Sequence, residues 1–158
     1  MLPIAIDPQT VRVGLAGAGE GMARRRALLA EAGVEPVESP YAVLFIAGLD
    51  HARSEALARK ARAQGVLVNV EDVPDLCDFH VPAILRRGDL AFTVSTNGKA
   101  PGLSRLLREW LGRTFGLEWT GRMEAVAAAR EGWRGEGLAP DEVSRRTRDM
   151  VGREGWLK

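Results

Sequence analysis

Short apolar runs alternate with helical patterns along the first hundred residues. A short apolar run over residues 11–16 and a continuous apolar run over 42–47 predict strands, and we also predict short strands over 34–38, 66–70 and 90–95. Apolar positions spaced three and four apart predict helices over 20–32 and 52–64, each ended by a glycine (Gly33 and Gly65). This alternation of strands and helices favours an α/β fold: a Rossmann-like parallel sheet with right-handed crossovers, shortened relative to larger members of the class.

Helical patterns alone fill the rest of the chain. Pro101 stands where a first helical turn tolerates proline, and an apolar stripe follows at Leu103, Leu106, Leu107, Trp110 and Leu111. Residues 121–158 also look helical, with glycine breaks at Gly132, Gly135, Gly137 and Gly152. We therefore divide the chain into a sheet domain, 1–100, and a helical region, 101–158. That region is too small for a strong core, which predicts packing against a partner subunit.

Composition narrows the class of protein. Apolar residues make up 46% of the chain, and the net charge of +1 gives no global attraction to nucleic acid. Cys77 is the only cysteine, so no intrachain disulfide forms, which suits a reducing compartment. The first residues lack a signal-peptide pattern, and no apolar run approaches the ~20 residues of a membrane span. We expect a cytoplasmic protein that binds neither membrane nor nucleic acid.

A glycine-rich turn joins the first predicted strand to the first predicted helix, with the sequence Gly17-Ala18-Gly19-Glu20-Gly21-Met22. In this context Gly17 permits the tight turn, and Gly19 lets the backbone approach a dinucleotide diphosphate at the helix N-terminus. The third small position of the motif is Met22, and Gly21 beside it gives the helix slack. Such turns also join strands to helices for purely structural reasons.

Residues after the next two predicted strands complete the expected nucleotide site. Glu38 has the spacing of the acid that binds the ribose hydroxyls, with Ser39 beside it, although a solvated strand-end glutamate fits equally well. Gly48, Leu49 and Asp50 follow the strand at 42–47, whose carboxyl end borders the same cleft.

The segment 69–82 follows a strand and contains acids, a cysteine and a histidine. Asp72 is the first carboxylate placed to project into the cleft; partly buried there, it would have a raised pKa and act as a general base. The alternative is an aspartate that serves only the turn before Pro74. Cys77 and His80 have the spacing of half a metal site, but no second pair exists, so we predict no metal site.

A polar loop precedes the helix that begins near Pro101. It offers backbone donors, hydroxyls and an ammonium group, a combination that binds anions, at Ser95, Thr96, Gly98 and Lys99. Arg105 adds positive charge. An ordinary capped helix start explains the same residues.

Several segments together resemble the precorrin-2 dehydrogenase / sirohydrochlorin ferrochelatase family, the N-terminal part of sirohaem synthase. The matching stretches are Leu2-Pro3-Ile4, the glycine turn, Ala23–Leu29, Asn69-Val70-Glu71-Asp72-Val73-Pro74 and Ser95–Arg108. The chain departs from the family pattern at Met22, Asn97 and Ala100, and in the short stretch between Glu38 and Ala42.

The resemblance implies an enzyme that uses NAD to dehydrogenate precorrin-2 to sirohydrochlorin, with possible insertion of Fe²⁺ as a second substrate. It implies that residues 1–100 bind NAD and that 101–158 form a homodimer and line the substrate cleft. It places the essential aspartate at Asp72 and substrate contacts at Asn69, Ser95, Thr96, Gly98, Lys99 and Arg105. A chelatase without NAD and a non-enzymatic nucleotide- or tetrapyrrole-binding module remain the alternatives.

Overall fold

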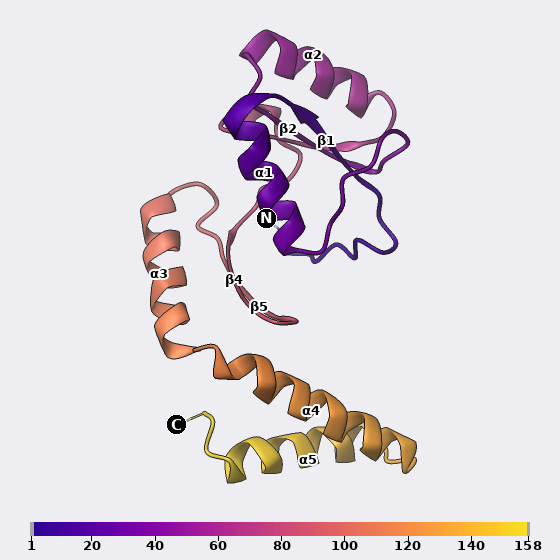
Figure 1. Ribbon diagram of the computed structural model, residues 1–158, viewed down its shortest axis with the longest axis vertical. Coiled ribbons are helices and arrows are strands. Elements are labelled where there is room, and N and C mark those ends of the chain that lie inside the picture. The colour runs from indigo at the N-terminus through magenta and orange to yellow at the C-terminus, as the bar shows by residue number, and fades with distance from the viewer. Residues whose placement is uncertain (1, 158) are drawn as a thin grey trace. The chain divides into compact units, whose positions relative to one another are not determined.

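The computed structural model describes residues 2–157 and divides the chain into two compact units, Met1–Val81 and Pro82–Lys158 (Figure 1). In the first unit, β1 (Val13–Gly17), α1 (Gly19–Glu31), β2 (Val43–Ala47), α2 (His51–Arg62) and β3 (Leu67–Val70) follow one another, and a short 3-10 turn spans Pro74–Leu76. The strands form a parallel sheet in the order β1-β2-β3.

Strand β2 is central and every residue in it is buried, as its uninterrupted apolar sequence predicts. On one face, Phe45 and Val43 pack with Val13 and with Leu29 of α1. On the other face, Leu44 and Ile46 pack with β3 and with the alanines of α2, Ala58 and Ala61. The two helices therefore cover opposite faces of the sheet, which leaves its carboxyl edge to the loops.

The strand predicted over 34–38 is absent, and this segment has no regular secondary structure. Pro36 has no N–H to donate to a neighbouring strand, so a regular ladder cannot form through it. The Val37 amide nevertheless donates to the Val13 carbonyl oxygen at 2.9 Å, so the segment runs along the free side of β1. Of the five strands predicted for one parallel sheet, three form it among the described residues; the strand at 34–38 is absent, and the one at 90–95 pairs antiparallel in a separate hairpin.

The second unit begins with an antiparallel hairpin of β4 (Ala83–Arg87) and β5 (Leu90–Val94). The sequence pattern did not predict a strand over 83–87. A two-residue Gly88-Asp89 turn joins the strands, and Gly88 has a φ of +58°, which glycine adopts readily. Since β4 pairs with β5 and not with the parallel sheet, the compact units divide at 81/82, whereas the predicted division fell at residue 100.

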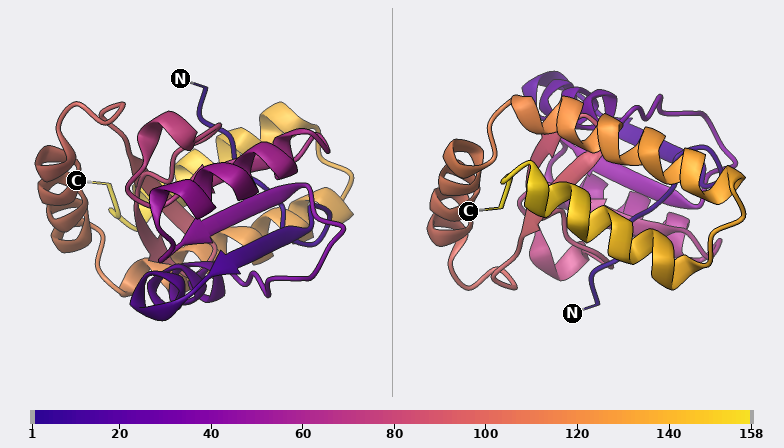
Figure 2. Two further views of the ribbon diagram at one scale, coloured as in Figure 1. Left: turned by 90° about the horizontal axis from the view of Figure 1, so that it is seen from above. Right: turned by 90° about the horizontal axis from the view of Figure 1, so that it is seen from below.

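Helices complete the second unit: α3 (Pro101–Thr114), α4 (Glu118–Gly135) and α5 (Pro140–Arg153). Helix α3 packs on the hairpin, and the ring of Phe92 in β5 lies 4.4 Å from that of Phe115 at the end of α3. Helices α4 and α5 lie side by side (Figure 2). Gly137, at a φ of +79°, makes the turn between them, whereas the predicted breaks at Gly132 and Gly152 fall inside helices. No helix within residues 2–157 has both the length and the apolar character needed to cross a membrane.

Candidate nucleotide-binding and catalytic site

Three loops meet at the carboxyl edge of the parallel sheet, one after each strand. The Ala18 amide, after β1, donates to the Ala47 carbonyl oxygen at 3.2 Å. The Glu71 amide, after β3, donates to the Ile46 carbonyl oxygen at 2.9 Å. Backbone hydrogen bonds therefore tie the first and third loops to the end of β2, so residues far apart in sequence share one edge.

The first two loops touch through glycines. Gly17 has a φ of +147°, and a Cβ on it would overlap the Ala47 carbonyl oxygen. Gly48 has a φ of +70°, and a Cβ on it would overlap the Ala18 carbonyl oxygen. Both positions thus require glycine for conformation and for space. Gly17 and Gly48 were predicted to bind the nucleotide; within the described chain, their lack of a Cβ lets the loops after β1 and β2 pack against each other.

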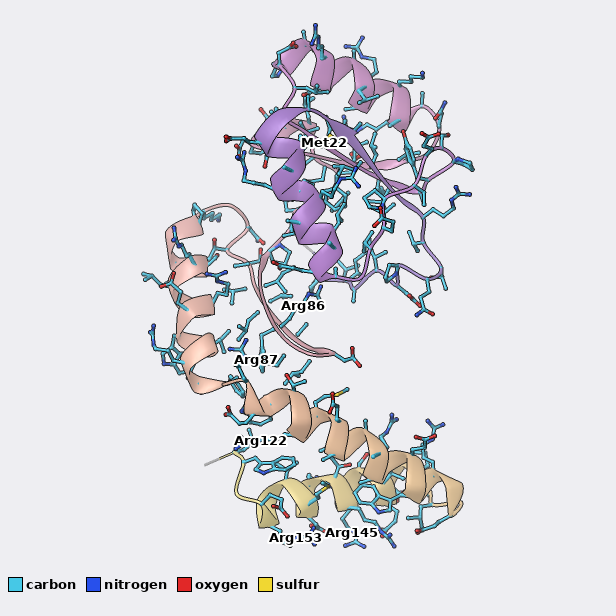
Figure 3. The ribbon with its side chains drawn as sticks, in the orientation of Figure 1. Met22, Arg86, Arg87, Arg122, Arg145 and Arg153 are labelled. Carbon is cyan, nitrogen blue, oxygen red and sulfur yellow. The ribbon has the colours of Figure 1, made fainter. Side chains whose placement is uncertain are left out.

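Gly21 lies where α1 approaches the turn after β2 closely. It is buried, and a Cβ on it would lie 2.8 Å from the Gly48 amide nitrogen and against the Glu71 carboxylate. Met22, labelled in Figure 3, is only half-buried. The departure from the motif at Met22 is therefore explained, because Gly21, one residue earlier, supplies the close packing that the motif's third glycine normally provides.

The N-terminus of α1 presents open hydrogen-bond donors. Its N-cap, Ala18, makes no side-chain cap bond, and no acceptor within residues 2–157 takes the amides of Gly19, Glu20 or Gly21. Gly19 has a φ of +61°, and the space where its Cβ would stand contains no atom within 4 Å. Unsatisfied amides beside an open glycine fit a diphosphate, which a helix N-terminus binds through N–H groups and the helix dipole.

The other residues predicted at this end of the sheet have local roles. The Asp50 carboxylate accepts from the Arg53 amide at 2.9 Å and so caps α2. Leu49 packs against the α2 core. The Glu20 side chain is 97% exposed, with its carboxylate 3.8 Å from Arg24. Of these residues, Glu20 is the one whose backbone amide remains open at the helix N-terminus.

Glu38 and Ser39 lie away from the glycine turn. The bond from Val37 to Val13 places them beside the start of β1, and Arg12 donates to the Glu38 carbonyl oxygen at 3.3 Å. Gly17 ends the same strand four residues later, about 13 Å along it at 3.3 Å per residue. The structure therefore does not bring the Glu38 carboxylate to the predicted ribose position.

Asp72 stands on the third loop with a left-handed backbone, at a φ of +58°. Non-glycine residues adopt this region infrequently, and aspartate is one of those that tolerate it best. Its neighbour Glu71 turns toward α1, where its carboxylate lies 3.5 Å from the Arg24 guanidinium. Asp72 itself is exposed within this chain, so the expectation of a partly buried carboxylate is not met: a left-handed turn after β3 carries the residue out of the sheet.

The segment after Asp72 is fixed to the edge of β3. The Asp78 carboxylate accepts from the Val68 amide at 2.8 Å and from the Arg62 Nε at 2.9 Å. The Cys77 thiol donates to the Val70 carbonyl oxygen and accepts from its amide, both at 3.2 Å. These hydrogen bonds indicate a structural role for Cys77. Among residues 2–157 no cluster of three or more metal-ligating side chains occurs.

Two polar groups beneath this loop are incompletely satisfied. Asn69 is buried, its Nδ2 donates to the Phe79 carbonyl oxygen at 2.9 Å, and its Oδ1 has no partner within the described chain. Arg25 carried no signal in the sequence; it stacks on Phe45 with its Cζ 5.3 Å from the ring centroid and makes no hydrogen bond or ion pair with the described residues. Burial lowers the pKa of the Arg25 guanidinium below its ordinary value, while the charge of Glu71 acts in the opposite direction.

The remaining predicted residues belong to the second unit, where they form the turn between β5 and α3. Asn97 and Gly98 have φ values of +53° and +76°. The Thr96 hydroxyl accepts from the Ala100 amide at 3.1 Å and lies 3.2 Å from the Ser104 hydroxyl, so it holds the turn together. Lys99 is exposed, and Arg105 is also exposed with its Nε 3.3 Å from Glu109.

Comparisons with known proteins agree with the resemblance seen in the sequence. Residues 34–83 match the profile of a family described as "Putative NAD(P)-binding". Siroheme synthase from Methylobacillus flagellatus is 42% identical over 95 residues, which are 60% of this chain and 20% of that protein. Siroheme synthase from Methylococcus capsulatus is 40% identical over 105 residues, 66% of this chain and 21% of that protein.

A solved structure supports the fold. The precorrin-2 dehydrogenase SirC superposes with a TM-score of 0.77 over 100% of this chain and 93% of its own, at 16% sequence identity. The predicted α/β, Rossmann-like fold and the resemblance to siroheme synthases are thereby confirmed. This chain spans about a fifth of the length of the siroheme synthases that it matches.

Proposed function

We propose that the chain binds NAD and catalyses the dehydrogenation of precorrin-2 to sirohydrochlorin. One observation carries the proposal: the open amides of α1 and the loop that bears Asp72 share the carboxyl edge of the sheet, with Glu71 packed against Gly21. Rossmann-like sheets bind ligands at this edge. The similarity to siroheme synthases and to a precorrin-2 dehydrogenase supports the choice of substrate.

The amides of Gly19, Glu20 and Gly21 would hold the NAD diphosphate. Because Gly19 has no Cβ, the space beside its backbone is free for the diphosphate. When bound, NAD supplies the acceptor for a hydride that leaves a substrate carbon. The Asp72 carboxylate takes the proton from a second carbon, and the electron pair of that broken C–H bond closes the new double bond. The protonated carboxyl then releases its proton to water, which returns Asp72 to its starting form.

Positive charge is expected to orient this substrate, because precorrin-2 is a polycarboxylate. Lys99, Arg105 and the backbone donors of Ser95, Thr96 and Gly98 form the proposed carboxylate-binding set. Asn69 on β3, three residues before Asp72, is the proposed contact from the sheet; its Oδ1, an acceptor with no donor within the described chain, would take a substrate N–H and not a carboxylate.

A second copy of the chain is the proposed partner. Apolar side chains on α3 are exposed within one chain, at 49% for Leu103, 63% for Leu106 and 52% for Trp110. Their spacing of three and four residues puts them on one helix face, which a second subunit would cover. A cytoplasmic location remains the prediction drawn from the single cysteine.

The decisive assay combines the purified protein and precorrin-2 with and without NAD and follows NADH and sirohydrochlorin by absorbance. We expect turnover that requires NAD, and a loss of about 100-fold or more in Asp72→Asn with NAD affinity unchanged. Asp75→Asn, a neighbouring exposed carboxylate, serves as the control and should keep full activity. Full activity in Asp72→Asn would remove Asp72 as the base, and absence of NADH with the wild-type protein would overturn the proposed activity.

Glu38 lies at the amino edge of the sheet, away from the predicted ribose position, and the NAD site therefore lacks its expected acid. This favours one alternative, a chelatase that inserts Fe²⁺ into sirohydrochlorin without NAD. In that case the wild-type protein would form sirohaem from sirohydrochlorin and Fe²⁺ with no NAD present. It would also leave precorrin-2 unchanged when NAD is added.

A further inference from the structure

We infer that this nucleotide site does not distinguish NAD from NADP. The inference rests on the proposed NAD site and concerns its adenosine end. In dinucleotide sites of this class, an acid after the second strand binds the ribose 2′-hydroxyl and disfavours a 2′-phosphate, whereas a nearby arginine accepts that phosphate. In this chain neither kind of side chain from the equivalent segment reaches the carboxyl edge.

The connection between α1 and β2 explains why. Helix α1 starts at the carboxyl edge and returns to the amino edge, where it ends at Glu31, and β2 starts at that same edge at Val43. The intervening chain stays there, because the Val37 amide binds the Val13 carbonyl oxygen and the Ala42 amide binds the Arg12 carbonyl oxygen, both at 2.9 Å. No strand carries this segment up the side of β1.

Both acidic residues of the connection lie at the amino edge. The carbonyl oxygen of Glu38 accepts from Arg12, which immediately precedes β1, at 3.3 Å. The Glu35 carboxylate lies 3.7 Å from the guanidinium of Arg26 on the later part of α1. The basic residue Arg12 is held at the same place, so it is equally remote from a 2′-phosphate.

Other acids at the carboxyl edge do not replace Glu38. Asp50 caps α2, and Glu71 pairs with Arg24. Both follow β2 or β3, on the side of β1 opposite to the segment that contains Glu38. The first-turn acid Glu20 is 97% exposed, so it provides no fixed acceptor for a ribose hydroxyl. The diphosphate contacts of NAD and NADP are then the same, and none of these acids is held where it would repel the 2′-phosphate or bind the 2′-hydroxyl.

Binding, measured apart from turnover, tests this inference. NADH and NADPH are titrated into the full chain at two salt concentrations, with affinity read from nicotinamide fluorescence. We expect dissociation constants within about threefold of each other at the higher salt, and Glu38→Gln to leave both unchanged. Gly19→Ala is the positive control and should weaken both dinucleotides together.

The outcomes separate the two claims. A preference for NADH of about tenfold or more that Glu38→Gln reduces would overturn the inference while leaving the proposed NAD site intact, because one hydrogen bond to a charged acceptor accounts for such a ratio. A comparable preference that Glu38→Gln does not change would also overturn it and would assign selectivity to another residue. Failure of both dinucleotides to bind would overturn the proposed NAD site itself.

Discussion

Gly21 on α1 lies directly against Gly48 in the turn after β2: a Cβ on Gly21 would be 2.8 Å from the Gly48 amide nitrogen and 3.0 Å from its Cα. These two Gly48 atoms are backbone, so they cannot rotate away as the Glu71 carboxylate beside them can. This approach sets the height of the helix N-terminus above the sheet, and with it the position of the open amides.

Gly21→Ala is therefore expected to push α1 away from the sheet. We predict a loss of about 1–3 kcal/mol in the free energy of unfolding, as for other overpacked sites, together with weakened NAD binding. Gly121→Ala on α4 is the control, because a Cβ there meets nothing within 4 Å and alanine favours a helix. Denaturant unfolding and NADH titration measure both effects; equal behaviour of the two variants would contradict the packing argument.

Gly19 and Gly33 form a matched pair at the two ends of α1. Their φ values are +61° and +70°, and a Cβ on either would stand in open space. Alanine at either position should cost a similar conformational energy, about 1–2 kcal/mol. Only Gly19→Ala fills the space proposed for the diphosphate, so only this variant should lose NADH affinity. The expected loss is about tenfold or more, which corresponds to one lost hydrogen bond. A comparable affinity loss in Gly33→Ala would show that helix strain, and not contact, controls binding.

Asp78 holds the loop that carries Asp72 against β3 through the Val68 amide and Arg62. Asp78→Ala leaves both donors without their acceptor, and we expect about 1–3 kcal/mol of destabilisation and a reduced kcat. Asp78→Asn keeps an acceptor for the Val68 amide and should recover part of the stability. Asp75→Ala is the control, and chemical unfolding followed by circular dichroism gives the ranking. Wild-type stability in Asp78→Ala would exclude this role.

Arg87 stabilises the end of α3 from β4. Its guanidinium donates to the carbonyl oxygens of Gly112 at 3.1 Å and Phe115 at 2.7 Å, which the end of the helix leaves without intrahelical partners, and to that of Gly116 at 2.9 Å. Arg87→Lys cannot reproduce this planar fork, so we expect a loss of about 1–3 kcal/mol. Arg86→Lys on the same strand is exposed and should be nearly neutral (Figure 3). Thermal unfolding distinguishes the two, and equal melting temperatures would contradict the capping role.

Glu142 on α5 should make stability depend on acid pH. Hydrogen bonding to Arg145 lowers the pKa of this carboxyl below its ordinary value of 4.5. Its contribution to folding is then fully present above pH 4.5 and is lost as the pH falls through the lower folded value. The difference in unfolding free energy between the wild type and Glu142→Gln should therefore shrink between neutral pH and about pH 3. A constant difference across that range would argue against the linkage.

Local patterns in the sequence predicted most elements of the first unit. The uninterrupted apolar run at 42–47 specified a strand buried on both faces, because no polar side chain in it has to reach water. The glycine turn located the N-terminus of α1, since left-handed or crowded backbone leaves few choices of residue. The hairpin of β4 and β5 was also available to sequence reasoning, through Gly88-Asp89 between two apolar runs.

Contacts between segments distant in sequence decided the rest. The segment 34–38 was predicted as a strand, but Pro36 has no N–H to donate to a neighbouring strand, and the Val37 amide is the group in it that bonds to β1, at the Val13 carbonyl oxygen. The spacing of Glu38 from the glycine turn therefore resembled a ribose site although the residue lies at the opposite edge. Likewise, only the contact between Gly21 and Gly48 in the folded chain shows that Gly21 takes the packing role of the motif's third glycine. Sequence thus determined most helices and strands of the first unit and where glycine is required, because those depend on neighbours along the chain. The tertiary structure decided which side chains meet at the carboxyl edge, because that depends on the path of the connections between the elements.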